Sequence, residues 1–108
     1  MRQISFPNNA FIARINPVDC KQDLLLELNT KLQFPYFGFN WDSLYDQLRD
    51  FYWIRQKYIF ILHNGLSLPY EDYEIYLSVL RDSEQYWLNY PDEHILKFVF
   101  DSHEQTWE

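Results

Sequence analysis

The chain has little of what several functional classes require. Its 108 residues include one cysteine and two glycines, and no run approaches the roughly 20 consecutive apolar residues of a membrane span. A lone Cys20 cannot form an internal disulfide, which fits a reducing compartment, so we interpret it as a small, partly buried residue. The N-terminus, MRQISFPNNA, lacks the charged start and apolar core of a signal peptide. We therefore expect a cytoplasmic protein without a membrane partner.

Basic residues are also scarce. Nine Lys and Arg stand against 16 Asp and Glu, which gives a formal net charge of −7. Residues 1–57 carry 7 basic and 6 acidic side chains, whereas residues 58–108 carry 2 basic and 10 acidic ones. Because phosphate binding depends on clustered Lys and Arg, direct binding of nucleic acid is not expected. The charge favours a basic protein as the partner.

What the chain does contain is hydrophobic and aromatic side chains. They make up 47% and 20% of the residues, respectively, which excludes disorder and predicts a packed, aromatic-rich interior. The length suits one hydrophobic core and is too short for two. With no internal repeat or linker, we expect a single domain over residues 1–108.

Six regular elements are predicted along the chain. Strand-forming residues predict strands at Ala10–Ile15, Lys57–Leu62 and Ile95–Phe100. Apolar side chains at helical spacing predict three helices: one capped by Asp19 with Gln22 and ending near Leu32, one over Trp41–Phe51, and one from Pro69 to about Tyr90. Helical connections make strands parallel. The order predicts an α/β fold with a small three-stranded parallel sheet, and the apolar second strand indicates cover on both of its faces.

The most informative stretch is Phe34–Phe51, read as FPYFGFNWDSLYDQLRDF. Gly38 is expected to set a tight turn through a dihedral that other residues avoid, and Asn40 is a good helix N-cap. In the helix that follows, spacing of three or four residues predicts a core-facing set of Leu44, Leu48 and Phe51.

A second set in this helix is acidic. Asp42, Asp46 and Asp50 lie four residues apart, so they form a carboxylate stripe on another face, although like charges at that spacing slightly oppose helix formation. Tyr36 and Phe37 on the preceding loop and Tyr45 within the helix are expected beside the stripe, and rigid aromatics next to charge are typical of a protein-binding surface. From the residues alone, however, an acidic helix face is more often only a solvated surface.

At these residues the sequence resembles the barstar family of ribonuclease inhibitors. The likeness lies in YFGFNWDSLYDQL, where aromatic residues, a glycine, a cap asparagine and two carboxylates follow in one order from Tyr36 to Leu48. The motif covers about an eighth of the chain, and the predicted order of elements extends the likeness over most of it. The resemblance implies a two-layer, barstar-like α/β fold and outweighs the solvated-surface interpretation.

The resemblance also implies a function and a site. The loop and second helix would enter the active-site cleft of a basic ribonuclease or nuclease toxin, and carboxylates would occupy the place of substrate phosphates. Asp46 would be the deepest carboxylate, among the cations that bind the scissile phosphate, with Asp42 as its partner. The remaining contacts implied by the family are Tyr36, Gly38, Asn40, Tyr45, Phe51 at the apolar edge, and Asp82 on the later helix.

Two features depart from the family pattern. Arg49 places a positive charge near the stripe, where it would pair with Asp46 at i, i+3 or contact an acidic group of a different partner. Residues 64–69 are shorter than the region where the family has an additional helix, so that helix is expected to be missing. The acidic tail Asp101–Glu108 has no assigned role and is expected to fray.

Enzyme interpretations are weaker. Asp42 and Asp46 resemble the acid and base of a glycosidase, but adjacent turns of one exposed helix rarely give two carboxylates the unequal environments they need. His63, His94 and His103 have no metal-ligand spacing, so no metal or cofactor is expected. The serious alternative is an interaction protein of the same fold that neutralises a toxin other than a ribonuclease, or regulates a cytoplasmic enzyme. The sequence does not fix the oligomeric state, and we expect a monomer before complex formation.

Overall fold

The computed structural model describes residues 6–100, so the acidic tail and His103 lie outside the described residues. Three strands alternate with three helices in the predicted order. The elements are β1 (Ala10–Ile15), α1 (Lys21–Leu32), α2 (Trp41–Leu48), β2 (Tyr58–His63), α3 (Tyr70–Leu88) and β3 (Ile95–Phe100). The first and last strands match the predicted ranges, and β2 lies one residue later than predicted.

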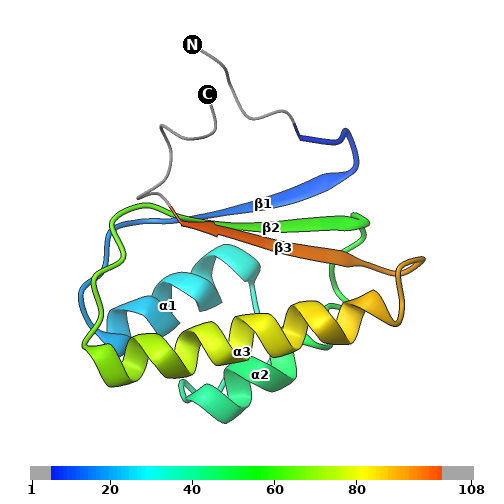
Figure 1. The fold of residues 1–108 in the computed structure, drawn as a ribbon. Helices are drawn as coiled ribbons and strands as arrows, with labels where there is room; N and C mark the ends of the chain where they lie inside the picture. The colour runs from blue at the N-terminus through cyan, green and yellow to red at the C-terminus, as the bar shows by residue number, and fades with distance from the viewer. Residues whose placement is uncertain (1–5, 101–108) are drawn as a thin grey trace.

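The strands form one parallel sheet in the order β1-β2-β3. Ala10 of β1 is in register with Tyr58 of β2, which in turn is in register with Ile95 of β3. All three helices lie on the same side of this sheet, as Figure 1 shows. The predicted three-stranded parallel α/β fold is confirmed, and it has two layers.

The expectation that β2 is covered on both faces is wrong, because the helices cover only one face of the sheet. Along β2 the residues alternate between buried and half-buried, and the buried set of Ile59, Ile61 and His63 shares one side. Phe60 points to the other side of the sheet, where the ring of Phe6 meets it edge-on at a centroid distance of 4.9 Å. An apolar run does not distinguish one covered face from two, because large side chains also occupy the half-buried face.

The start of α1 also differs from the prediction. Its N-cap is Cys20, which has extended backbone and makes no side-chain capping hydrogen bond, so Asp19 does not cap this helix. The helix is secured instead by its apolar stripe of Leu24, Leu25, Leu28 and Leu32, all of which are fully buried. Cys20 is half-buried, as predicted.

Helices α1 and α3 pack against the sheet, whereas α2 packs on α3. The ring of Trp41 lies 6.1 Å from that of Tyr76, and the indole of Trp87 donates a hydrogen bond of 2.8 Å to the carbonyl of Leu48. The first residue of α2 thus meets an earlier residue of α3 than its last residue does, so α2 runs alongside α3 in the same direction.

The end of α2 comes earlier than predicted, at Leu48 instead of Phe51. Phe51 has a left-handed backbone with φ of 50°, and its fully buried ring stacks on Trp87 at a centroid distance of 6.0 Å. The prediction that Leu44, Leu48 and Phe51 face the core is confirmed, because all three are fully buried. The packing of Phe51 against α3 is therefore favoured over a further turn of α2.

A buried polar pair connects the sheet to α3. The Nδ1 atom of His63 lies 2.8 Å from the carbonyl oxygen of Val99, and its Nε2 lies 2.6 Å from the hydroxyl of Tyr76. Because a carbonyl only accepts, Nδ1 donates to it, and in the neutral ring Nε2 accepts from the Tyr76 hydroxyl. Burial raises the pKa of the Tyr76 hydroxyl, so it stays protonated and keeps donating.

Residues 64–69 form no helix, as expected from their length. Val18 and Leu66 form an isolated parallel bridge instead, and the amide of Ser67 donates to the carbonyl of Val18 at 3.0 Å. The segment therefore continues the pairing of β1 and β2 beyond the sheet. Within residues 6–100, no helix combines the length and apolar character needed to cross a membrane.

Candidate partner-binding surface

The loop before α2 is shaped by local hydrogen bonds. The carbonyl oxygen of the Asn40 side chain accepts from the Ser43 amide at 2.7 Å, which confirms Asn40 as the N-cap of α2. The Gly38 amide donates to the Ser43 hydroxyl at 2.8 Å. These bonds fix the loop against the first turn of the helix. Ser43 was missed in the sequence, although its place three residues after a cap asparagine was the signal.

Gly38 acts differently from the prediction. The left-handed residue in this loop is Phe39, with φ of 55°, and Gly38 is not among the residues with positive φ. A Cβ at Gly38 would lie 3.2 Å from the Asn40 side-chain nitrogen and 3.5 Å from Ser43. Glycine is therefore suited to this position by close approach to the helix cap, and not by a special dihedral.

Two carboxylates of the predicted stripe lie on α2. Asp42 and Asp46 are both exposed and one helical turn apart, and 71% of the Asp46 side-chain surface is accessible. Asp50 is exposed too, but it follows the end of the helix and lies in a turn. The expectation of three carboxylates on one helix face is thus wrong for Asp50, because α2 ends before it.

Asp82 is exposed on α3. Two contacts join α2 to α3, one from Trp41 to Tyr76 and one from Leu48 to Trp87. Along its own helix, each of Asp46 and Asp82 lies between these two contacts. Asp82 also precedes Tyr86 by four residues, so the two side chains share one side of α3. Tyr86 lies within reach of Arg49 of the segment after α2, which indicates that this side of α3 borders α2. We call Asp42, Asp46 and Asp82 the acidic surface.

Of the predicted aromatic neighbours, Tyr45 lies beside the acidic surface, since Arg49 contacts both its ring and Asp46. Tyr36 in the loop is 81% exposed, and Tyr45 on α2 is half-buried. The guanidinium of Arg49 stacks on Tyr45, with its carbon 3.7 Å from the ring centroid, and its Nη2 lies 3.0 Å from Oδ1 of Asp46. The predicted pairing of Arg49 with Asp46 is confirmed. Tyr86 was missed, because nothing in the sequence of α3 reveals its position beside α2.

Phe51 does not lie at the apolar edge of this surface. Its side chain is fully buried between Trp87, Trp53 and His94, with ring centroids 5.7–6.0 Å away. The expected contact role of Phe51 is therefore wrong. Phe51 follows the end of α2, where the chain turns inward to fill the core.

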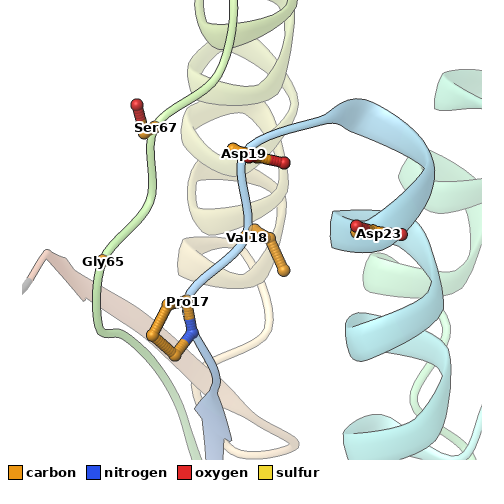
Figure 2. A pocket seen from close by; sticks show the side chains of 6 residues that line it. All are labelled: Pro17, Val18, Asp19, Asp23, Gly65 and Ser67. Carbon is orange, nitrogen blue, oxygen red and sulfur yellow. The ribbon is translucent and has the colours of Figure 1, made fainter.

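A second group of acidic side chains lies at the start of α1, away from α2. Pro17, Val18, Asp19, Asp23, Gly65 and Ser67 line an open hollow of about 230 Å³ between the β1–α1 and β2–α3 connections (Figure 2). Ligand atoms of Asp19, Cys20 and Asp23 come within 4.8 Å of one another there. Both carboxylates are exposed, as is common for acidic groups at a surface. This hollow is separate from α2.

Together the fold and the surface define a class: a small α/β protein with one parallel sheet and a helix that displays exposed carboxylates beside aromatic side chains. The family model described as "Barstar (barnase inhibitor)" matches residues 9–101. The chain therefore belongs to the barstar family, whose members are inhibitors rather than enzymes. Compared with the curated proteins, the chain has no match.

Proposed function

We propose that this protein is an immunity protein that inhibits a basic ribonuclease by placing its acidic surface in the active-site cleft. It belongs to a family described by inhibition of barnase, a ribonuclease, and its fold presents Asp42 and Asp46 on one exposed helix. The partner is a cationic ribonuclease or nuclease toxin, and inhibition takes place in the cytoplasm, without a cofactor and without chemistry on RNA.

The observation that carries this proposal is the contrast between the two sides of α2. Leu44 and Leu48 are fully buried, and the end of the helix is tied to α3 by the hydrogen bond from Trp87. Asp42 and Asp46 project from the opposite, exposed side of the same rigid segment. Rigid display lowers the conformational entropy lost on binding, so the carboxylates are preorganised to meet fixed cations.

The mechanism follows from the charges. A cleft that binds RNA holds cations at the spacing of phosphate groups, and carboxylates on successive helical turns offer negative charge at a comparable spacing of about 5–6 Å. Asp46, in the middle of the surface, takes the place of the scissile phosphate. Tyr36 and Tyr45 cover the rim and exclude water from the charged contacts. RNA is excluded because its binding site is filled.

Inhibition of barnase by the purified protein tests this function. Asp46→Ala should weaken binding by about 2–5 kcal/mol, because it leaves cations of the nuclease buried and unpaired, and Asp42→Ala should weaken it less. This range includes measurements on the barnase–barstar complex, so it is not independent of the family. Asp19→Ala is the matched control: it removes the same charge at the hollow of Figure 2. Equal effects at Asp19 and Asp46 would mean that only net charge matters.

Salt dependence tests the charge mechanism and separates it from the alternative. Screening shortens the Debye length from about 30 Å at 0.01 M to about 3 Å at 1 M salt. Association with barnase should therefore slow steeply over that range. A rate independent of salt, or no inhibition of barnase at all, would favour the alternative of an interaction module whose partner is another toxin or enzyme.

A further inference from the structure

Among the described residues, Arg49 is the one basic residue that forms an ion pair with the acidic surface. Its Nη2 lies 3.0 Å from Oδ1 of Asp46, and the pair is accessible to solvent on both sides, with 31% of the arginine and 71% of the aspartate side chain exposed. An exposed ion pair at i, i+3 contributes little to stability, because solvent screens the two charges. Folding therefore gives little reason for this arginine.

The arginine is nevertheless held firmly in place. Its guanidinium carbon lies 3.7 Å from the ring centroid of Tyr45 and 5.8 Å from that of Tyr86, and its Nε donates to the Tyr45 carbonyl at 3.3 Å. Contacts from both α2 and α3 thus fix the charge in front of Asp46. A flexible arginine would move aside when a partner arrives, whereas a stacked one stays and is carried into the interface.

We propose that Arg49 is a specificity-determining residue, an internal counter-ion that weakens the attraction of Asp46 for densely cationic sites. This inference rests on the proposed function and deepens it. Arg49 neutralises one charge of the acidic surface within hydrogen-bonding distance, so a cleft with a second cation at that point meets repulsion as well as attraction.

The chemistry of the guanidinium also describes the favoured partner. Arginine has five N–H donors, and two of them are used by Asp46 and the Tyr45 carbonyl. Burial of the remaining donors without acceptors would oppose binding. The preferred cleft therefore presents a carboxylate or carbonyl oxygen beside the cation that meets Asp46, and such a pattern distinguishes it from a uniformly basic surface.

The test compares three variants of the full chain in binding to barnase by stopped-flow fluorescence. Arg49→Gln removes the counter-ion, Arg49→Lys keeps its charge but not its planar fork, and Arg14→Gln makes the same change in net charge elsewhere. Arg14 is exposed on β1 between buried Ala13 and Ile15, so it points away from the helices and serves as the matched control.

At low salt, Arg49→Gln should associate about fivefold faster than wild type, and this gain should disappear near 1 M salt. Arg14→Gln should change the rate by less than twofold, and Arg49→Lys should remain near the wild-type rate. Equal acceleration by Arg14→Gln and Arg49→Gln, or slower association of Arg49→Gln, would overturn the role of Arg49. So would acceleration by Arg49→Lys, because that variant retains the charge.

A second probe separates this inference from the proposed function. Hexalysine is a dense cation without a cleft, and its binding to the protein is followed by NMR shifts of the α2 amides. Arg49→Gln should bind hexalysine severalfold more tightly than Arg14→Gln does. If no variant inhibits barnase but this difference persists, the proposed function fails and the counter-ion role stands. If barnase is inhibited but the difference is absent from both probes, the counter-ion role fails alone.

Discussion

The two sides of the segment from Phe34 to Phe51 differ in burial and therefore in the property that each of them controls. The inner side, with Leu44, Leu48 and Phe51, is fully buried and fixes where the helix lies. The outer side, with Asp42 and Asp46, is exposed to solvent. Under the proposed function, stability and binding are assigned to opposite faces of one short segment. Substitutions on the two sides should therefore be separable.

The largest effect is expected on the inner side, from Phe51→Ala. Removal of a fully buried phenylalanine from a core leaves a cavity and costs about 3–5 kcal/mol of unfolding free energy. The left-handed backbone at this position is equally strained for both residues, so the loss reports on packing. Urea denaturation measures it. Inhibition of barnase per folded molecule should be unchanged, and a specific loss of binding by the folded variant would contradict the separation.

The next effect concerns the bond that ties the end of α2 to α3. Trp87→Phe removes the indole N–H that donates to the Leu48 carbonyl, and loss of a partner from a buried polar group costs about 1–3 kcal/mol. Trp53→Phe is the matched control, because its indole donates at the same distance of 2.8 Å to the Leu32 carbonyl at the end of α1. Both variants should lower the denaturation midpoint, but only Trp87→Phe should also weaken inhibition, by a fewfold.

On the outer side, Tyr36→Ala should leave the unfolding free energy within about 0.5 kcal/mol of wild type, since the side chain is 81% exposed. It should speed dissociation from barnase about tenfold, because tyrosine is enriched among the interface residues that carry most of the binding energy. Tyr70→Ala is the control, since Tyr70 is 76% exposed on α3. Surface plasmon resonance gives both off-rates. Equal off-rates for the two variants would remove the loop from the interface.

The smallest effect is expected where the two sides meet, at the helix cap. Asn40→Ala removes the acceptor for the Ser43 amide and costs about 1 kcal/mol of stability. Because Asp42 lies in the first turn after the cap, inhibition should weaken by about twofold or less. Asn40→Ser retains a capping oxygen and should recover most of the loss in thermal unfolding. A variant at Asn40 that weakened binding more than Asp42→Ala would make the cap itself a contact.

Much of the fold was predictable because its signals are local. The alternation in Ala10–Ile15 and the run Ile95–Phe100 predicted β1 and β3 with the observed bounds, and the leucine spacing predicted the buried stripe of α1. Asn40 was identified as a cap for the same reason, since its hydrogen bond spans three residues. The wrong cap at Asp19 shows the limit of such signals: a second arrangement of similar energy was available one residue away.

The sequence by itself determined the elements, their parallel order and the candidate carboxylates, because hydrophobic spacing and caps act over a few neighbouring residues. Only the tertiary structure decided that the helices cover one face of the sheet, that α2 ends at Leu48, and that Phe51 turns into the core. It also brought Tyr86 of α3 beside Arg49, 37 positions apart in the chain. These features depend on contacts between segments distant in sequence, whose packing energy outweighs local propensity.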